Sequence, residues 1–397
     1  MRIEEAQIGR RVREVRLWRG KSLTALAGLA GMSPAYLSMI ERGLRPVTKR
    51  ATLESLARAL QVAPTELTGR PYSPTDAESN TAHAGMPGVI DALTSWSIGE
   101  APDHSSRTWD ELRAESEWLT LTLRPNADYA NQATMLPALI RDLLATAVAG
   151  AHRTEALVCL LSAYTAAACL ARDLGVAGLA TLAAERVRRV AEELDDPGWL
   201  AYAAYRRAHL LTGVNRVRQY ELAAAAAELP GARVEVAGMS HLTAAFAAAT
   251  QGDGATALDH LAAAERLAER IEPDVSPWMQ TNFGRTNVGI WRVGIGVELG
   301  EGAKIAEVAA KVRPEAVSRR RQADFWIDYG RGLLTERKHQ DRGVAALLTA
   351  EKLAPQRVRN DVFVREAVSA LLVNARRDAG GRELRGLAWR TGIAPTG

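Results

Sequence analysis

Hydroxyl and cationic groups follow one another closely in residues 33–50, SPAYLSMIERGLRPVTKR, with small apolar side chains between them. Hydroxyls and guanidinium groups bind the phosphate oxygens of nucleic acids, whereas apolar groups contact the C5-methyl of thymine. The positions expected to face bases hold no Arg, Asn or Gln, the residues that make bidentate base contacts. The stretch therefore favours binding to a polyanion, with sequence read through hydroxyls, methyl contacts and DNA shape.

A helix-turn-helix must position these groups. Ser33 is a good N-cap residue, and Pro34 suits the first turn of a helix because its missing N–H costs no hydrogen bond there. A preceding helix is expected to begin at Ser22, with the small Ala27 where the two helices cross closely. Gly31 stands four residues later, where the turn favours a left-handed backbone. This spacing predicts two helices joined by a tight turn, with the second helix facing a DNA groove.

The residues expected to contact DNA fall into two groups. Those expected to face base edges are Ser33, Pro34, Ala35, Tyr36, Ser38 and Met39. Those expected to bind phosphates are Arg42, Arg45, Thr48, Lys49 and Arg50. Thr48 is also expected to cap a fourth helix, whose N-terminus can bind a phosphate. The alternative for Tyr36 is packing against the protein itself.

The positive charge of the chain is concentrated near its N-terminus. Residues 1–70 contain 13 Lys or Arg and 6 Asp or Glu, a difference of +7, whereas the other 327 residues contain 37 and 40, a difference of −3. A basic N-terminal part on a nearly neutral body suggests that the N-terminal part alone has a polyanionic partner. The alternative is a charged helix that is merely solvated.

Residues 6–68 resemble the Xre (phage-repressor-like) helix-turn-helix family, because YLSMIERGLRP followed by TLESLARALQVAPTEL is close to its usual sequence. The resemblance implies a five-helix, lambda-repressor-like domain over residues 1–70 that binds double-stranded DNA. It also implies a structural ion pair between Arg16 and Glu41. The chain departs from the family at Leu23, where a phosphate-binding Gln is common, and Ser22 and Thr24 are its expected substitutes.

The bulk composition is that of a globular protein, with 47% hydrophobic and 24% charged residues. No run of about 18 apolar residues occurs, so no membrane span is expected. The N-terminal sequence lacks the apolar core of a signal peptide. Cys159 and Cys169, ten residues apart on one expected helix, point in different directions and are not expected to pair. We therefore expect a cytoplasmic protein without a membrane partner.

Motifs for catalysis or cofactor binding are incomplete. GKS at 20–22 lacks the earlier Gly of a phosphate-binding loop, and GIGVELG at 294–300 has neither the spacing nor the preceding strand of a dinucleotide site. No H-E-x-x-H occurs, and two cysteines cannot build a usual zinc site. We therefore expect no enzymatic activity, no metal and no cofactor.

The remainder of the chain has the pattern of a helical array. Residues 71–107 are expected to form a linker with one short helix, VIDALTSW. From about Trp109, Ala- and Leu-rich segments with helical periodicity alternate with short polar loops, at a repeat of roughly 35–40 residues. The sequence therefore predicts an all-α chain in which residues 108–397 form an α-solenoid of antiparallel helix pairs.

One helix pair resembles the tetratricopeptide pattern. In AAFAAATQGDGATALDHLAAAERL, Gly252 and Asp253 stand at the turn, and the small Ala257 and Ala264 allow close helix crossing. GVAALLTAEKLAP, residues 343–355, repeats the pattern of the second helix. The whole arrangement resembles actinobacterial Xre-type regulators with a tetratricopeptide-like C-terminal domain. The resemblance implies a curved array whose concave surface binds a peptide, a small ligand or a protein partner.

The residues expected to line that surface are polar and aromatic. They are Asn282, Arg285, Asn287, Trp291, Phe325 and Asp328. Asn offers a donor and an acceptor for a peptide amide, Arg can pair with a carboxylate, and Trp offers a stacking face. The alternative is structural, with each Asn bonded to a neighbouring loop and the Trp in the core of a repeat.

These features together predict a sequence-specific transcriptional regulator. We expect it to bind an inverted-repeat operator as a homodimer. The helical body is expected to dimerise, to sense a ligand or to bind a protein partner. The alternative is an interaction scaffold whose N-terminal domain binds DNA only non-specifically, since the expected recognition helix lacks bidentate base readers.

Overall fold

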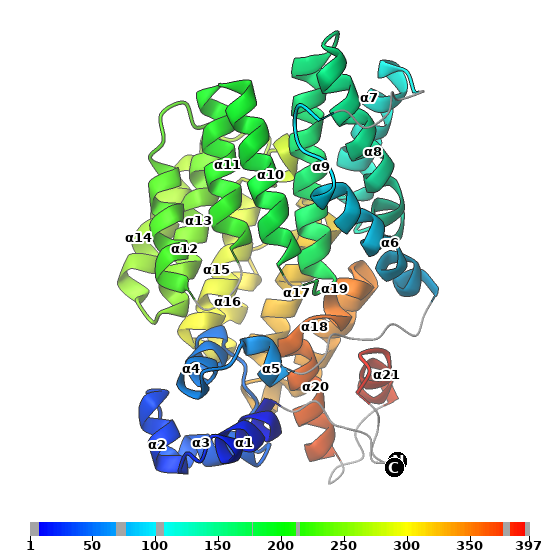
Figure 1. The fold of residues 1–397 in the computed structure, drawn as a ribbon. Coiled ribbons are helices and arrows are strands. Elements are labelled where there is room, and N and C mark those ends of the chain that lie inside the picture. Colours follow the sequence, from blue (N-terminus) through cyan, green and yellow to red (C-terminus); the bar gives the residue numbers. More distant parts are fainter. Residues whose placement is uncertain are drawn as a thin grey trace.

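The computed structural model describes residues 8–68, 77–100, 107–176, 178–211, 215–375 and 382–393. Over these residues the protein is helical, apart from one isolated antiparallel bridge between Val275 and Gly284. The expected all-α class is therefore confirmed. A small N-terminal domain, residues 8–68, lies at one end of a larger helical body that begins at Ala77 (Figure 1).

The N-terminal domain has five helices. They are α1 (Ile8–Trp18), α2 (Leu23–Leu29), α3 (Pro34–Glu41), α4 (Arg50–Leu60) and α5 (Pro64–Thr68). The expected caps are present, because the Ser22 and Ser33 hydroxyls accept the backbone N–H groups of Ala25 and Tyr36 at 3.1 and 3.2 Å. The expected cap at Thr48 is wrong: α4 begins at Arg50, and its N-cap residue is Lys49, which makes no side-chain cap bond.

Close packing and one ion pair hold α1 against α3. A Cβ atom on Gly9 would stand 1.9 Å from the Ile40 carbonyl oxygen, so only Gly fits at this crossing. Arg16 donates to both carboxylate oxygens of Glu41, at 2.6 and 2.8 Å, and both side chains are nine-tenths buried or more. The ion pair that the family resemblance implied is therefore confirmed.

The first half of the body consists of long helices joined by short turns. They are α6 (Ala77–Thr94), α7 (Trp109–Trp118), the π-helical turn η1 (Leu119–Leu123), α8 (Tyr129–Ala149), α9 (Arg153–Asp173), α10 (Leu179–Leu194), α11 (Pro197–Leu210), α12 (Arg216–Ala227), α13 (Val234–Thr250) and α14 (Gly254–Ala268). Helix α6 is longer than the short helix expected, although it contains Pro87. It packs on α8, where a Cβ on Gly85 would stand 2.8 Å from Ala133 Cβ.

The second half contains more short helices. Its elements are η2 (Trp278–Gln280), α15 (Arg285–Leu299), η3 (Gly302–Lys304), α16 (Ile305–Ala309), η4 (Pro314–Ala316), α17 (Arg319–Leu333), η5 (Arg337–His339), α18 (Gln340–Leu353), α19 (Pro355–Arg359), α20 (Val362–Ala375) and α21 (Arg382–Arg390). The turn expected at Gly252 and Asp253 joins α13 to α14, and Gly252 there adopts a positive φ, as Gly300 does just after α15.

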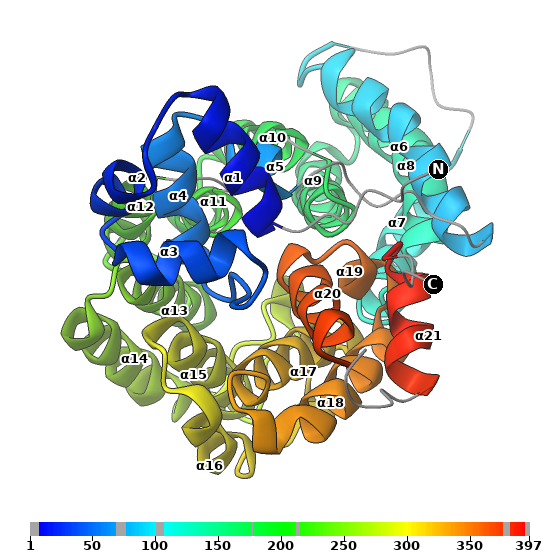
Figure 2. The same cartoon turned by 90° about the horizontal axis from the view of Figure 1, so that it is seen from below.

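The body helices form an inner and an outer series. Consecutive helices from α8 to α15 pack against one another, and α13 contacts α11 and α15 while α15 also contacts α17. Seen along the axis of the body, the helices follow one another around a curve, with the N-terminal domain over one opening (Figure 2). Helices α9, α11, α13, α15 and α17 are therefore placed to supply the side chains inside the curve.

The curve of the body closes where α9 meets α17. The Arg320 guanidinium pairs with Asp173 at 2.6 Å, and the backbone N–H of Arg319 donates to the Pro125 carbonyl at 2.8 Å. These contacts join residues about half of the body apart in sequence. The body therefore encloses an interior, and the polar residues of this junction border it.

Helix α9 has the length and composition of a membrane-spanning helix. In its most apolar 18-residue window, however, 72% of the residues are buried inside the protein. The expectation of no such segment missed this helix because Ser162, Tyr164 and Thr165 interrupt its apolar run. Burial on all sides between α8, α10 and α17 is the setting of a core helix.

Candidate DNA interface and interior cavity

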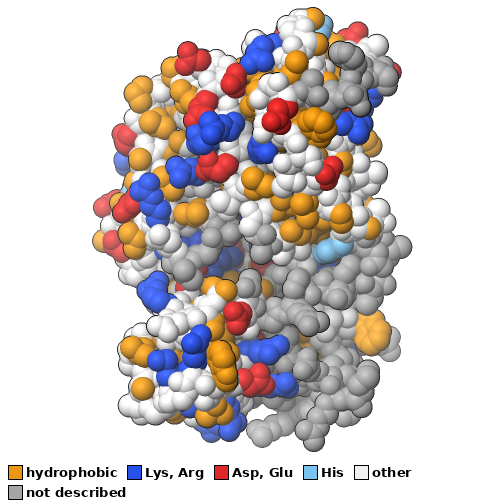
Figure 3. Space-filling view, viewed as in Figure 1, with side chains coloured by type: hydrophobic (Ala, Val, Ile, Leu, Met, Phe, Trp, Pro, Cys, Tyr) orange, Lys and Arg blue, Asp and Glu red, His pale blue; other side chains and the backbone are white. Residues whose placement is uncertain are grey.

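The helix-turn-helix pair lies on the side of the N-terminal domain that is remote from the body (Figure 1). The axes of α2 and α3 differ by 108°, within the usual range for this motif. Most of the predicted contact residues on this side are exposed, namely Ser22, Thr24, Ser33, Pro34, Ala35, Arg42 and Arg45. Lys and Arg side chains are visible on this domain in the space-filling view (Figure 3).

Three predicted base-facing residues are half-buried. They are Tyr36, Ser38 and Met39. The Tyr36 ring packs against the apolar core of the N-terminal domain, which is the alternative that the sequence left open for it. The Ser38 carbonyl accepts two donors from Arg42, its backbone N–H at 3.1 Å and its guanidinium at 3.2 Å. Ser38 and Met39 therefore present only part of their side chains to an approaching groove.

The last three predicted phosphate ligands along the chain, Thr48, Lys49 and Arg50, face the body instead of solvent. The Arg50 guanidinium pairs with Glu298 of α15 at 2.6 Å, and its backbone N–H donates to the same carboxylate at 3.0 Å. The Thr48 carbonyl accepts a hydrogen bond from Arg331 of α17. The Lys49 ammonium lies beside Gly300, at the carboxyl end of α15. These residues therefore hold the domain on the body in this arrangement.

Further contacts extend the same interface. The Glu54 carboxylate pairs with Arg216 of α12 at 2.7 Å. The Glu366 carboxylate, on α20, accepts the backbone N–H groups of Ile8 and Val47 at 3.1 and 3.5 Å. Phe363 packs into the apolar core of the N-terminal domain. The domain is therefore joined to α12, α15, α17 and α20 at once.

Two buried glutamates of this interface have opposite environments. Burial raises the pKa of Glu298, but the neighbouring Arg331 and Arg50 outweigh it and hold that pKa below its usual value. Glu366 has no ion pair with a cationic side chain among the described residues. Burial raises its pKa to about 7, although the hydrogen bonds from the Ile8 and Val47 N–H groups oppose this change. Glu298 is therefore a stable anion, whereas Glu366 gains a proton near neutral pH.

An interior cavity of about 280 Å³ lies within the curve of the body. Helices α9, α11, α13, α15 and α17 border it, and Arg50 reaches it from the N-terminal domain. Four of the six residues predicted to bind a ligand line this cavity, namely Asn282, Asn287, Trp291 and Asp328. The sequence therefore indicated the right helices for an interior surface.

The other two predicted ligand residues do not border the cavity. Arg285, at the start of α15, points outward and pairs with Asp274 at 3.4 Å and Glu272 at 3.5 Å. Phe325 is 2% exposed and belongs to a separate apolar cluster with Ile290 and Val293. The expectation that they share one surface with Asn287 is wrong, because a helix turns about 100° per residue.

Both predicted asparagines are already bonded within the protein. The Asn287 side-chain oxygen accepts from Arg321 at 2.7 Å, and that of Asn282 accepts the backbone N–H of Ser318 at 3.1 Å. This is the structural alternative that the sequence left open. The indole N–H of Trp291, by contrast, is buried and has no hydrogen-bond partner among the described residues.

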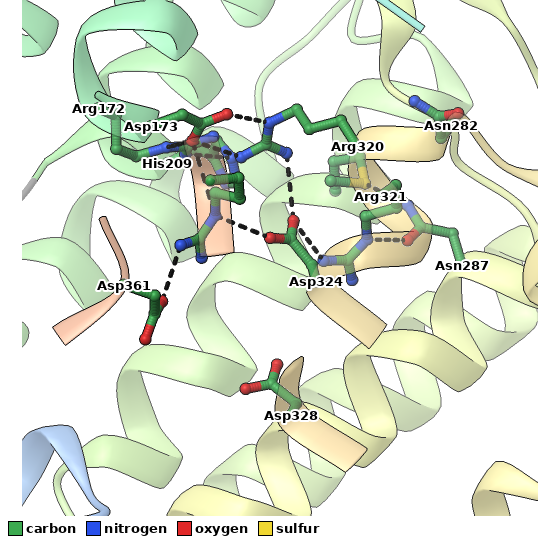
Figure 4. A network of polar contacts seen from close by, with 12 residues as sticks. Arg172, Asp173, His209, Asn282, Asn287, Arg320, Arg321, Asp324, Asp328 and Asp361 are labelled. Carbon is green, nitrogen blue, oxygen red and sulfur yellow. Dashed lines mark hydrogen bonds and ion pairs between the residues drawn. The ribbon is translucent and has the colours of Figure 1, made fainter. Parts of the chain in front are cut away.

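A network of arginines and aspartates crosses the cavity wall (Figure 4). Asp173 contacts Arg320 at 2.6 Å and Arg172 at 3.4 Å. Asp324 contacts Arg320 at 3.2 Å and Arg321 at 3.4 Å. Although burial raises the pKa of Asp324, Arg320 and its other cationic neighbours hold it well below the usual range. Both aspartates are therefore anionic anchors for the surrounding arginines.

Sequence analysis missed most of these cavity arginines. The missed residues are Arg124, Arg172, Arg206, Arg216, Arg320, Arg321 and Arg357. A signal was present in the sequence, because YRR at 205–207 lies within the Ala-rich helix α11 and RRR at 319–321 begins α17. Among the described residues, no three His, Cys, Asp or Glu side chains are grouped to hold a metal ion.

Comparison with known proteins gives one match. Residues 7–68 match a protein family described as a helix-turn-helix domain, and this range coincides with α1 to α5. The N-terminal domain is therefore a helix-turn-helix domain, of the kind that binds DNA in transcriptional regulation. No curated protein and no solved structure matches the chain.

Proposed function

We propose that this protein is a sequence-specific transcriptional regulator of the Xre type. The observation that supports this most is the capped helix α3, which lies in a helix-turn-helix domain with Ser33, Pro34 and Ala35 exposed on its outer side. Exposed hydroxyl and apolar groups at the start of α3 can contact base edges and thymine methyls. Arg42 and Arg45, also exposed, would supply phosphate contacts and hence much of the affinity.

The proposal extends to the assembly and to the body. The regulator binds an inverted-repeat operator as a homodimer, and its body is a tetratricopeptide-like array that senses a peptide, a small ligand or a protein partner. It acts in the cytoplasm without catalysis or a cofactor. The contacts of Arg50 and Glu54 with the body support a link between the two parts, since a ligand that changes the body must act on this interface.

A gel-shift experiment with fragments of the protein's own promoter region tests this proposal. The regulator retains a large preference for one fragment over random DNA as salt is raised, while its overall affinity falls with salt. Ser38→Ala and Met39→Ala, both on helix α3, change which DNA fragment the protein binds most tightly. Arg189→Met, an exposed change on α10, serves as a control. Absence of any retarded band with folded protein contradicts the proposal.

A second candidate is an interaction scaffold that binds DNA only non-specifically. The observation that favours it is the lack of Arg, Asn or Gln on the exposed side of α3. The same titration separates the two candidates. A scaffold binds promoter fragments and random DNA alike at every salt concentration, whereas the regulator discriminates between them.

A further inference from the structure

The interior cavity has a large excess of cationic side chains. Eight arginines and three aspartates border it. The arginines are Arg50, Arg124, Arg172, Arg206, Arg216, Arg320, Arg321 and Arg357, and the aspartates are Asp173, Asp324 and Asp328. Arginine keeps its charge under all physiological conditions, so this excess cannot be removed by loss of protons.

Some of these arginines form ion pairs with carboxylates that do not border the cavity. Arg50 pairs with Glu298, and Arg216 pairs with Glu54. The remaining charge is therefore concentrated on the six arginines deeper in the body.

Four of those six share two carboxylates. Asp173 and Asp324 are the ion-pair partners of Arg172, Arg320, Arg321 and Arg357. Arg357 has one further partner in Asp361, at 2.7 Å. Three carboxylates thus serve four guanidinium groups.

The other two arginines have no carboxylate partner within 4 Å among the described residues. Arg206 is 3% exposed, donates one N–H to the Met279 carbonyl at 3.1 Å, and has a buried Nε without a partner. Its guanidinium lies over the rings of Tyr202 and Tyr205, 5.0 and 4.9 Å from their centroids.

Arg124 is 8% exposed, and its nearest polar partner is the Ser162 hydroxyl at 3.5 Å. Burial lowers its pKa, as expected for a cation without a counter-charge. A buried and unpaired cation is costly, and the cost is relieved when an anion enters the site.

Uncharged ligand-binding groups lie beside these cations. The Trp291 indole, with its unpartnered N–H, faces the cavity, and Arg321 stacks on it at 4.9 Å. His209 borders the same space, and burial together with Arg172 and Arg206 lowers its pKa well below the usual value. A neutral imidazole and an indole can contact the uncharged part of a ligand without adding charge.

We propose that the cavity binds a small organic anion with at least two negative charges, carried by phosphate or carboxylate groups. Arg206 and Arg124 bind its charges directly, and Trp291 contacts its uncharged part. A volume of about 280 Å³ suits a small metabolite, since ligand-binding pockets commonly measure roughly 300–1,000 Å³. The inference rests on the ligand-sensing role proposed above and names the chemical class of that ligand.

Titration calorimetry and thermal unfolding of the full-length protein, without DNA, test the proposal. The probes are inorganic pyrophosphate, citrate and ADP. Glycerol is the uncharged control, and NaCl at the ionic strength of the probe solutions is the salt control. At least one probe anion binds with one site per chain and raises the unfolding temperature, whereas the controls do not. Arg206→Met weakens that binding by at least about tenfold, because a charge-assisted contact is lost.

Matched variants separate the cavity from the basic N-terminal domain. Arg189→Met removes an arginine of α10 whose side chain is 66% exposed and leaves anion binding unchanged. Arg206→Met also removes the hydrogen bond to Met279 and the contacts with the Tyr202 and Tyr205 rings, so its folding is checked by thermal unfolding without an anion. Arg124→Met provides an independent second test of the cavity if Arg206→Met does not fold.

Two outcomes overturn the inference. One is failure of all three anions to bind at concentrations up to about 10 mM. The other is unchanged binding in both Arg206→Met and Arg124→Met, which would show that the anion does not bind these two arginines. Since DNA is absent from these measurements, loss of anion binding leaves the gel-shift result intact, and failure of the gel shift leaves the anion result intact.

Discussion

Arg50 at the start of α4 and Glu298 of α15 form an ion pair of 2.6 Å, although 248 positions separate them in the sequence. Arg331 of α17 contacts the same carboxylate at 3.0 Å, and the Glu298 side chain is fully buried. One carboxylate thus joins the helix-turn-helix domain to two helices of the body. The residue that the sequence predicts as a phosphate ligand has a protein carboxylate in the place of the phosphate.

Glu298→Gln is expected to lower the free energy of unfolding by about 3 kcal/mol, because it leaves Arg50 without its anion and Arg331 with Asp328 alone. Urea denaturation measures the change. Glu221→Gln is the matched control, since the pair of Glu221 with Arg218 is about half exposed and is worth less than about 1 kcal/mol. Equal stability of both variants would show that the buried pair does not support the interface.

The same variant is expected to bind DNA more tightly at low salt, since Glu298 no longer competes with phosphate for Arg50. The gain should be about threefold to tenfold and should disappear in the double variant with Arg50→Gln. Fluorescence anisotropy with a labelled operator fragment, at a temperature where each variant is folded, gives these affinities. Weaker DNA binding by Glu298→Gln alone would contradict the competition.

Arg45→Ala is expected to weaken binding to all DNA sequences and to reduce the salt slope of the affinity by about 1, as for loss of one phosphate contact. Ser38→Ala is expected to leave the slope unchanged and to alter base preference by about 1 kcal/mol. Affinities for a set of single-base operator variants over a salt series measure both effects. A change of base preference in Arg45→Ala would mean that Arg45 contacts a base.

Arg16→Met is expected to destabilise the N-terminal domain by about 3–5 kcal/mol, because Glu41 would remain buried and charged without its bidentate partner. Hydrogen exchange of the α1 and α3 amides, measured by mass spectrometry on the full chain, reports this locally. Arg10→Met is the control, since Arg10 and Glu14 are about half exposed and their pair contributes less than about 1 kcal/mol. Equal exchange in the two variants would refute a structural role for Arg16.

The pH dependence of stability is expected to include a contribution from Glu366. Its pKa is about 7 in the folded protein against 4.5 for an ordinary glutamate, so the folded state binds more protons between these two values. Stability is therefore lost as the pH rises through this interval, and the full loss of about 3 kcal/mol is reached above pH 7.

Glu366→Gln tests this contribution, since Gln keeps one acceptor oxygen, enough for one of the Ile8 and Val47 N–H groups, and cannot ionise. We expect it to match the unmodified protein at about pH 4.5 and to exceed its stability above pH 7. The difference between the two denaturation series cancels other titrating groups, such as His209. A difference that does not change with pH would rule out Glu366 as the titrating group.

Local features of the fold were predictable from the sequence. Ser22 and Ser33 cap their helices through hydroxyls three residues before the N–H groups that they accept, so neighbouring residues alone determine these starts. The start of α4 was not predictable in this way. Lys49 and Arg50 are positioned by α15, and Thr48 is bonded to α17, so distant contacts decide where that helix begins.

The interior site was predictable only in part. The helical periodicity of apolar residues identifies the face of a helix that packs against the core. An inner helix packs against other helices on both sides, so this periodicity does not tell which of its polar residues point into the cavity. Asn287 and Arg285 are two residues apart on α15, yet one borders the cavity and the other pairs with Asp274 outside it. Arg206 and Arg320 reach the cavity because the curve of the body brings α11 and α17 together, which no local pattern encodes.

The position of Arg50 makes the cavity and the DNA-binding domain depend on a single guanidinium group. It borders the cavity, pairs with Glu298 and is a predicted phosphate ligand. When Arg50 leaves Glu298 to bind an operator phosphate, the cavity loses one of its bordering cations, so the operator and an anion held by Arg206 and Arg124 act as antagonists. Thermodynamic reciprocity requires that DNA lower the affinity for the anion by the same factor by which the anion lowers the affinity for DNA. The occupied operator would thus set the anion concentration to which the protein responds.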